Sequence, residues 1–229
     1  ALSGGRRLRR ADLLATWDDA GLETAGQRGY HLLWHLAQDG LVCFGPLSAA
    51  EPQIVLIDEW IARPRRPERE EAIGELALRY FRSHGPATSK DFVRWTKLPA
   101  ADARLGLTLA RPQLACLPVD GVEYFMDPET PELLSARRRQ ARGVFLLPGF
   151  DEFILGYGDR SAMLDAEDFD RIVPGGNGMF RPTVISGGRV VGTWKHTGSG
   201  AKRTVSATPF EAFPDRVATA ISRVYAKLP

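Results

Sequence analysis

A set of helices followed by a β-hairpin occurs twice within the first 130 residues, and this recurrence restricts the possible folds more than any other feature. In the first copy, residues 11–21 and 26–40 carry apolar residues at helical spacing and each end in glycine. Two short β-like runs, LVCFGPL and QIVLIDEW, follow on either side of SAAEP. This order of elements is typical of a winged helix-turn-helix.

The second copy begins with a predicted amphipathic helix over residues 67–85, acidic at its start and basic at its end, as the helix dipole favours. Thr88 or Ser89 is placed to cap the next helix, and Pro99 to open the one after it. Asp120 and Gly121, between LACLPV and VEYFMD, are a strong signal for a two-residue hairpin turn. We therefore predict two units of one architecture, although their residue identities barely match.

The sequence changes character after the second hairpin. Residues 131–142 form a predicted helical connector with a basic end, and residues 143–210 are rich in glycine and β-branched residues. Residues 213–228 have the apolar spacing of a final amphipathic helix. We therefore predict an α+β fold in which tandem winged helix-turn-helix units precede a small, barrel-like β-rich domain with a C-terminal helix, at residues 1–62, 63–130 and 131–229 respectively.

Composition indicates a globular chain with no membrane partner. Hydrophobic residues make up 44% of it, the net charge is +2, and the longest apolar runs are too short to span a bilayer. The start has no secretory signal, and the two cysteines, Cys43 and Cys116, are expected to be small buried hydrophobic residues in a reducing compartment. These features predict a cytoplasmic protein. Because the chain opens with ALSGGRRLRR and not with methionine, we expect it to be truncated or processed.

The most informative segment for function is residues 179–210, which contain no Asp or Glu although the whole chain is close to neutral. We predict a cationic β-hairpin around Gly187 and Gly188 that contacts the DNA backbone with the aid of Trp194. The other interpretation is a solvated basic face with Trp194 in the core. The candidate DNA-binding residues are Arg181, Arg189, Lys195, His196, Lys202 and Arg203.

The two helix-turn-helix units give weaker evidence for contact with bases. The first predicted wing, SAAEP, has no positive charge, and the second, VDGVE, is acidic. Wings that contact phosphate are usually basic, so at least one unit is expected to be architectural. Two further basic clusters, at residues 6–10 and 137–142, are either solvated helix ends or additional contacts.

The segment LLPGFDEFILGYGDR, residues 146–160, places Asp151 and Glu152 after a Pro-Gly turn. In a strand the two acids point to opposite faces and form no acid/base pair. In a tight turn one of them caps the short helix FILGY, and the other meets an arginine such as Arg160 or Arg181. The alternative places Asp151 on the wall of a nucleic-acid channel. Asp151, Glu152, Arg160 and Trp194 are thus channel or structural residues.

The motifs for common catalytic sites are missing. HLLWH, which contains His31 and His35, lacks the glutamate of the zinc-protease motif, so we predict no metal site. No glycine cluster fits the phosphate-binding loop GxxxxGK[ST], and no Gly-x-Ser-x-Gly elbow is present. We therefore predict no cofactor, no bound nucleotide and no catalytic residue within this chain.

Several segments resemble bacterial winged-helix DNA-binding proteins, a family that includes alkyl-DNA glycosylases and glycosylases that unhook interstrand crosslinks. The resemblance covers essentially the whole chain and is most specific in LLPGFDEF and GRVVGTW; HGPATSKDFVRWTKLP and PGGNGMFRPTVISGGRVVGTWK also contribute. It implies three tandem winged helices in a C-shape plus a small β-barrel, with duplex DNA in the concave channel.

The resemblance also implies a mechanism for the glycosylase members. In these, a Gln-x-Gln or Gln-x-Asp motif in the first winged helix activates a water molecule, which attacks an oxocarbenium-like sugar, and no metal or cofactor is needed. This sequence has no such motif. The first winged helix is therefore expected to be missing, and no catalytic residue is carried over.

Four possible functions remain open from the sequence. We favour a double-stranded DNA-binding protein, a fragment of a DNA-repair protein that contacts the backbone and reads shape. The alternative is a glycosylase, a hydrolase of N-glycosyl bonds in bulky alkylated or crosslinked bases, when the missing module is present. A second alternative is a non-catalytic interaction scaffold, whereas a small-molecule enzyme needs a closed polar pocket around Asp151 and Arg160. The oligomeric state stays open.

Overall fold

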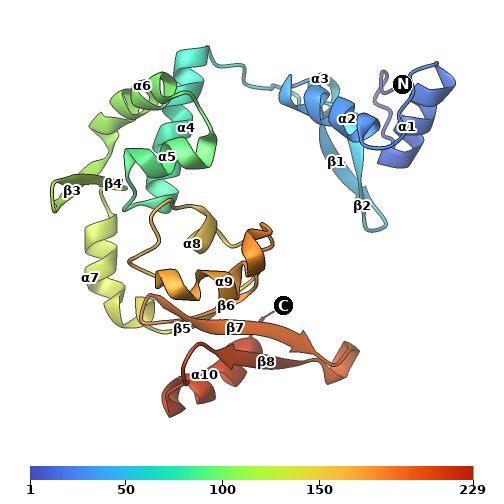
Figure 1. The fold of residues 1–229 in the computed structure, drawn as a ribbon. Coiled ribbons are helices and arrows are strands. Elements are labelled where there is room, and N and C mark those ends of the chain that lie inside the picture. Colours follow the sequence, from blue (N-terminus) through green and yellow to red (C-terminus); the bar gives the residue numbers. More distant parts are fainter. Residues whose placement is uncertain (229) are drawn as a thin grey trace. The chain divides into compact units, whose positions relative to one another are not determined.

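The computed structural model describes residues 1–228, without the side chain of Ala201, and its contacts divide the chain into two units. Unit 1 is Ala1–Pro67, and unit 2 runs from Glu68 onward. Figure 1 shows the helices and strands of both units. None of the helices formed by residues 1–228 combines the length and the apolar character needed to cross a bilayer. The domain boundaries expected at residues 62 and 130 stay predictions.

Unit 1 consists of two helices, a β-hairpin and a short third helix. These are α1 (Arg10–Asp19), α2 (Arg28–Gln38), β1 (Val42–Ser48), β2 (Glu51–Leu56) and α3 (Ile57–Trp60). Its core joins Leu13, Leu33 and Ile54, and a bridge between Leu8 and Ile54 holds the segment before α1 against the hairpin. The predicted strand QIVLIDEW is partly wrong, because it ends at Leu56 and IDEW forms α3. Its Asp and Glu disfavour a strand.

Unit 2 begins with three helices and a hairpin. They are α4 (Arg69–His84), α5 (Ser89–Thr96), α6 (Ala100–Ala110) with the 3-10 turn η1 (Arg111–Gln113), and β3 (Ala115–Val119) paired with β4 (Val122–Met126). The predicted cap of α5 is confirmed at Thr88, which forms a capping box with Asp91. Pro99 precedes α6 as predicted. The hairpin turn at Asp120 and Gly121 is also confirmed.

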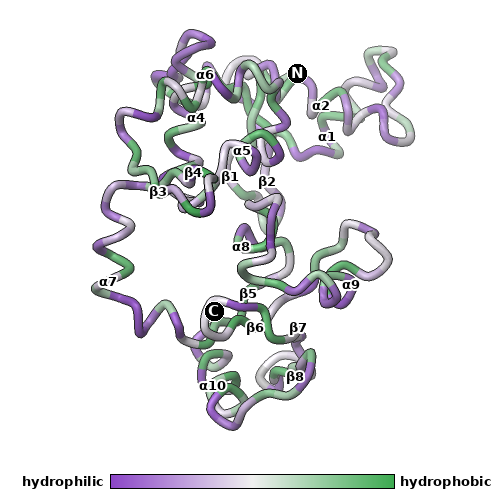
Figure 2. The backbone as a smooth tube through the Cα atoms, turned by 60° about the vertical axis from the view of Figure 1, so that its left-hand side comes forward, coloured by the Kyte–Doolittle hydropathy of each residue, from purple (hydrophilic) through white to green (hydrophobic). Residues whose placement is uncertain are grey.

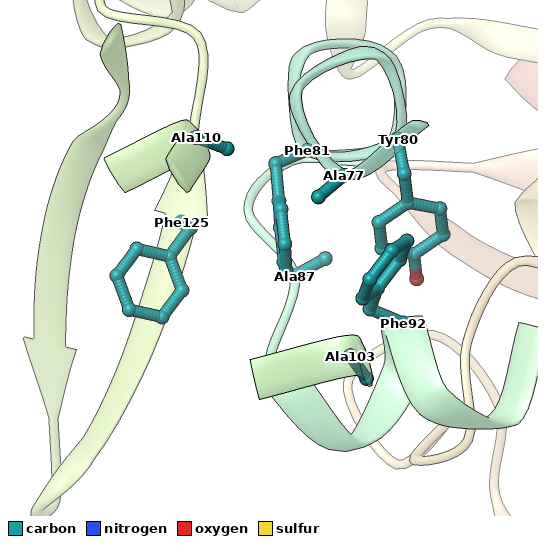
Figure 3. Close-up of a cluster of buried hydrophobic side chains, with 8 residues drawn as sticks. All are labelled: Ala77, Tyr80, Phe81, Ala87, Phe92, Ala103, Ala110 and Phe125. Carbon is teal, nitrogen blue, oxygen red and sulfur yellow. The ribbon is translucent and has the colours of Figure 1, made fainter. Parts of the chain in front are cut away.

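An aromatic core holds these three helices and the hairpin together. Figure 3 shows Phe81 and Tyr80 from α4 with Phe92 from α5 and Phe125 from β4. Small side chains, among them Ala77, allow the helices to approach closely. The backbone of Ala87 pairs with Phe125 and thereby fixes β4 beside the start of α5.

The two cysteines differ from the prediction of buried hydrophobic residues. Cys43 is only partly buried, and Cys116 is exposed. For Cys116 the reason lies in the β3–β4 hairpin, where burial is confined to Phe125 and Met126 at the end of β4. A two-stranded hairpin covers one strip of one face, so most of β3 remains in contact with solvent.

A four-stranded sheet, covered on one face by the last helix of the chain, forms the second half of unit 2. After α7 (Thr130–Ala141), the strands β5 (Val144–Leu147), β6 (Thr183–Ser186), β7 (Arg189–Thr197) and β8 (Thr204–Pro209) pair in sequence order and antiparallel. The helix α10 (Asp215–Tyr225) packs on one face, where Val184 and Trp194 meet Val217 and Ile221. Four strands form an open sheet, so the barrel-like closure expected from the sequence does not form within residues 1–228.

Residues 148–182 correct the prediction of a continuous β-rich region. They form α8 (Glu152–Leu155), the 3-10 turns η2 (Ala166–Asp168) and η3 (Pro174–Gly176), and α9 (Phe169–Ile172), with no strand among them. This segment packs on the sheet through Ile154, Leu164 and Ile172 against Ile185 and Val190. Glycines and prolines at both ends of the segment interrupt strand pairing.

The motif GRVVGTW has a structural explanation in β7. The register between β6 and β7 shifts between Val184 and Ile185, which creates a bulge on β7 opposite them. Gly192 follows the bulge, and a Cβ atom there would lie 2.4 Å from the carbonyl oxygen of Thr208. Only glycine fits this approach of β7 to β8. Two residues later, Trp194 points into the core beneath α10.

Candidate nucleic-acid interface

The end of the β7–β8 hairpin, residues 195–203, gathers four of the predicted DNA-binding residues, and we call it the hairpin tip. Lys195 and His196 lie near the end of β7, opposite Ser206 and Val205 of β8. Lys202 and Arg203 follow in the turn between the strands, which is the 3-10 turn η4 (Gly200–Lys202) and the residue after it. The antiparallel pairing brings cations seven residues apart in sequence to the same end of the sheet.

Trp194 anchors the hairpin tip and does not face solvent. Its side chain is 7% exposed, and its indole Nε1 donates a hydrogen bond to the carbonyl oxygen of Leu147 at 2.8 Å. His196 lies on the same face, with its ring edge-on to Trp194 at 5.0 Å between centroids. The position of Trp194 therefore matches the interpretation that places this residue in the core. Because the indole is buried, little of its ring surface is available to stack on a base.

Of these four residues, His196 and Arg203 contact each other and Tyr225, whereas Lys195 and Lys202 have no such partners within residues 1–228. The Nε of Arg203 donates to Nδ1 of His196 at 3.1 Å and to the hydroxyl of Tyr225 at 3.3 Å. Lys195 and Lys202 are exposed, and neither has a carboxylate partner within residues 1–228. Ammonium groups without a partner are suited to bind phosphate, because no internal ion pair must break first.

Arg181 and Arg189 lie elsewhere and have internal partners. Arg189 forms an ion pair with Asp165 at 2.7 Å and also donates to the carbonyl oxygen of Ala162. Arg181 donates to the carbonyl oxygen of Arg171 at 3.3 Å. Six residues of extended strand separate Arg189 from Lys195, or about 20 Å. The cations of the acid-free segment 179–210 therefore do not form one continuous surface. No local feature of the sequence identifies Asp165 as the partner of Arg189.

The acidic pair Asp151 and Glu152 performs two different structural tasks. Asp151 caps α8, because its Oδ1 accepts a hydrogen bond from the backbone of Phe153 at 2.9 Å, which confirms the predicted capping. The predicted arginine partner of Glu152 is wrong. Its Oε2 accepts from Nε1 of Trp95 at 3.0 Å and lies 3.1 Å from Nε2 of His84.

Residues 151–158 dock on α4 and α5 through hydrogen bonds to the backbone, and we call this contact the junction. The hydroxyl of Tyr80 donates to the carbonyl oxygen of Gly156 at 2.7 Å, and the hydroxyl of Tyr157 donates to the backbone carbonyl oxygen of His84 at 2.6 Å. The amide of Gly158 donates to Oδ1 of Asp91 at 2.7 Å. A Cβ atom on Gly156 would lie 2.5 Å from the His84 ring, so the approach requires glycine.

Burial keeps both tyrosines of the junction protonated. It raises the pKa of Tyr80 and of Tyr157 above the ordinary value, and the nearby carboxylate of Asp91 acts in the same direction. Both hydroxyl groups therefore remain donors across the physiological pH range. The hydrogen bonds of both hydroxyl groups thus support a structural role for the junction.

Arg160 also has a structural position. Its Nε donates to the carbonyl oxygen of Ile154 at 2.7 Å, and its guanidinium lies over the rings of Phe169 and Phe180. Burial lowers the pKa of Arg160, and the positive charge of Arg94 adds to the effect. A cavity of about 470 Å³ borders Arg160, yet Asp151 does not line it. This cavity therefore does not join the two residues, as a pocket for a small-molecule substrate would.

The two histidines of HLLWH have separate neighbours. Nε2 of His35 lies 3.4 Å from Asp39, and His31 packs edge-on against Tyr30. Residues 1–228 contain no group of three or more His, Cys, Asp and Glu side chains placed to hold a metal ion. We therefore assign neither histidine to a metal site.

Comparisons with known proteins point to one family. A family model described as DNA glycosylase AlkZ-like matches residues 1–228. An interstrand DNA cross-link repair glycosylase from Streptomyces sahachiroi is 30% identical over 168 residues, which cover 70% of this chain and 44% of that protein. The solved structure of Streptomyces sahachiroi DNA glycosylase AlkZ superposes with a TM-score of 0.72 at 24% identity, over 97% of this chain and 61% of that one.

Two conclusions follow from these comparisons. The structural likeness shows a shared α+β fold of helices and small antiparallel sheets. The chain spans about half the length of the relatives that it matches.

Removing the cap of α8 tests the structural role of Asp151. We expect Asp151→Ala to lower the free energy of unfolding by about 1 kcal/mol, because the amide of Phe153 loses its acceptor. Asp151→Asn is the matched control, since asparagine caps helices as well as aspartate does. Urea unfolding gives the stabilities, and DNA affinity should stay unchanged in both variants. A loss of DNA affinity without a loss of stability would instead place Asp151 in a channel wall.

Proposed function

This chain belongs to the AlkZ-like DNA glycosylase family, and we propose that it binds duplex DNA within a protein that excises bulky alkylated or crosslinked bases. The observation that carries the binding role is the hairpin tip, where Lys195 and Lys202 are exposed without carboxylate partners. The family match supports DNA as the partner. The excision role rests on the family and on the relative named for cross-link repair.

Binding at the hairpin tip uses charge and not base recognition. Lys195, Lys202 and Arg203 present ammonium and guanidinium groups that suit phosphate oxygens. Contacts of this type position a protein on DNA without reading its sequence. Each neutralised phosphate releases counterions, so affinity falls with salt with a slope of about 0.9 per contact. His196 and Trp194 support the tip from the side of α10.

We further propose that the helices and hairpins of both units are winged helix-turn-helix modules. In unit 1 these are α1, α2 and the β1–β2 hairpin, and in unit 2 they are α4 to α6 and the β3–β4 hairpin. Neither hairpin turn carries a cation: the first contains Ala49 and Ala50, and the second contains Asp120 and Gly121. We therefore assign these modules a role in shape and support, and the hairpin tip the main contact with phosphate.

We assign no catalytic residue within this chain. The sequence contains no Gln-x-Gln or Gln-x-Asp pair, and the acids of LLPGFDEF are engaged in capping and in the junction. The proposed excision therefore depends on groups outside the residues assigned above. A base that reacts within a duplex must leave the stack or be reached in an unpaired strand.

A second candidate function, protein interaction, is supported by the apolar surface of unit 1. Tyr30 and Trp34, one turn apart on α2, are 52% and 55% exposed, and Phe44 and Leu47 on β1 are 68% and 69% exposed. A contiguous patch of such groups is typical of an interaction site, and we propose that these side chains form one. This surface and the hairpin tip involve different residues, so the two functions are compatible.

Replacing the two free lysines tests the proposed contact. We expect Lys195→Gln with Lys202→Gln to reduce the salt slope of duplex binding by about 1.8, because two phosphate contacts are lost. Fluorescence anisotropy with labelled duplex at a series of salt concentrations measures the slope. Arg216→Gln with Arg223→Gln on α10 is the charge-matched control and should keep the slope of the unmodified chain.

Equal slopes for the lysine variant and the unmodified chain would remove the hairpin tip from the interface. A salt-independent affinity of the unmodified chain would contradict phosphate binding altogether. Urea unfolding of each variant confirms that the replacements leave the fold intact.

An excision assay tests the assignment of no catalytic residue. We expect the 229-residue chain to bind duplex DNA that carries bulky alkylated bases without releasing them, since no group is assigned to activate water. Alkaline cleavage of labelled duplex detects abasic sites. Release of bases by this chain at a rate above that of free DNA would show that a catalytic group lies within it.

A further inference from the structure

The helix α7 lies in solvent along its whole length. Every residue from Pro131 to Ala141 is exposed, and the helix buries no side chain. Even its two leucines, Leu133 and Leu134, are 49% and 56% exposed. Isolated helices of about 12 residues are only marginally stable in water, and packing of an apolar face normally holds them. Within residues 1–228, no element supplies that packing to α7. Figure 2 shows its hydrophilic end next to β5.

Four unpaired arginines lie at the C-terminal end of this helix. Some other arginines of unit 2 have carboxylate partners, for example Arg82 with Asp127 and Arg111 with Glu123. The four at the end of α7 have none within residues 1–228; they are Arg137, Arg138, Arg139 and Arg142. The region around them is therefore strongly positive, whereas the chain as a whole has a charge of only +2.

One face of α7 and the turn between β6 and β7 line a groove of about 660 Å³, which we call the α7 groove. The turn consists of Gly187 and Gly188, and the amide of Gly187 donates to the carbonyl oxygen of Gly143 just after the helix. Only two of the four arginines line this groove, and no carboxylate does. Its lining residues on α7 and just after it are Pro131, Leu134, Ser135, Arg138, Ala141 and Arg142.

We propose that the α7 groove binds the sugar–phosphate backbone of DNA, as a second contact that is separate from the hairpin tip. This inference rests on the proposed function. Arg138 and Arg142 stand four residues apart, so their Cβ atoms lie about 6 Å apart on one helix face. A DNA strand carries one charge per about 3.4 Å of helix axis, so the two forks reach neighbouring phosphates. Pro131 and Leu134 supply an apolar wall for deoxyribose.

Phosphate binding at the groove would add stability to α7, which buries no side chain. Cations at a helix C-terminus interact favourably with the dipole, which accounts for some stability without any ligand. That effect does not select one face of the helix, because all four arginines are near its end. Phosphate binding does select a face, since only Arg138 and Arg142 line the groove. Comparing the groove pair with the other two arginines therefore allows the two roles to be separated.

The test compares two double variants of the same helix with the same loss of charge. Arg138→Gln with Arg142→Gln changes the groove face, and Arg137→Gln with Arg139→Gln is the matched control. We expect the groove variant to reduce the salt slope of duplex binding by about 1.8, and the control by less than half of that. A labelled duplex of about 21 base pairs, or two helical turns, serves as the probe.

Hydrogen exchange of the unmodified chain provides a readout that does not depend on any variant. We expect the amides of α7 to exchange more slowly when duplex DNA is bound, because the ligand stabilises a marginal helix. The groove variant should lose this protection, and the control should keep it. Far-UV circular dichroism and urea unfolding show whether each variant is folded.

The outcomes separate this inference from the proposed function. A salt-dependent affinity of the unmodified chain with equal slopes for both variants overturns the groove and leaves the hairpin tip in place. Unprotected α7 amides in the DNA-bound chain also overturn the groove. An unmodified chain that binds no duplex overturns the proposed function and the inference with it. Loss of the slope in the groove variant alone, with protection of α7, supports the groove.

Discussion

The arrangement of unit 2 depends on the junction, and above all on the carboxylate of Asp91. This side chain is buried, and a buried carboxylate requires hydrogen bonds to offset its lost hydration. It accepts hydrogen bonds from the backbone amide and the hydroxyl of Thr88, which caps α5. It also accepts one from the amide of Gly158, which belongs to the segment 148–182 that packs on the sheet. One group thus closes a helix and joins the helical part to the sheet. Because the junction connects these parts directly, α7 is not needed to hold them together and its surface is available to a ligand.

Local chemistry made a large part of the fold predictable from the sequence. The cap at Thr88 and the two-residue turn at Asp120 need only neighbours within a few positions, and both were predicted correctly. The partners of Glu152 and Arg189 were not predicted, since His84 and Asp165 lie far from them in sequence. The short helices of residues 148–182 were missed for a related reason. Their packing on Ile185 and Val190 decides their conformation, and no period in the sequence shows it.

The segments that carry the family resemblance are mainly structural. LLPGFDEF provides the cap of α8 and the acceptor for Trp95, and GRVVGTW provides the bulge of β7 and the core tryptophan. Such motifs identify the fold reliably, but they hold no reacting group. The candidate interface instead consists of exposed cations whose significance comes from the absence of partners within residues 1–228. Only a structure shows that Arg189 is paired while Lys195 is not.

The central claim is that duplex DNA covers the hairpin tip, and chemical acetylation of lysines in the presence and absence of DNA tests it most directly. Mass spectrometry reports the modification of each lysine separately. The account predicts that Lys195 and Lys202 become protected by duplex DNA, while Lys227 is acetylated equally with and without it. Full acetylation of both tip lysines in a chain that is saturated with DNA would contradict the account.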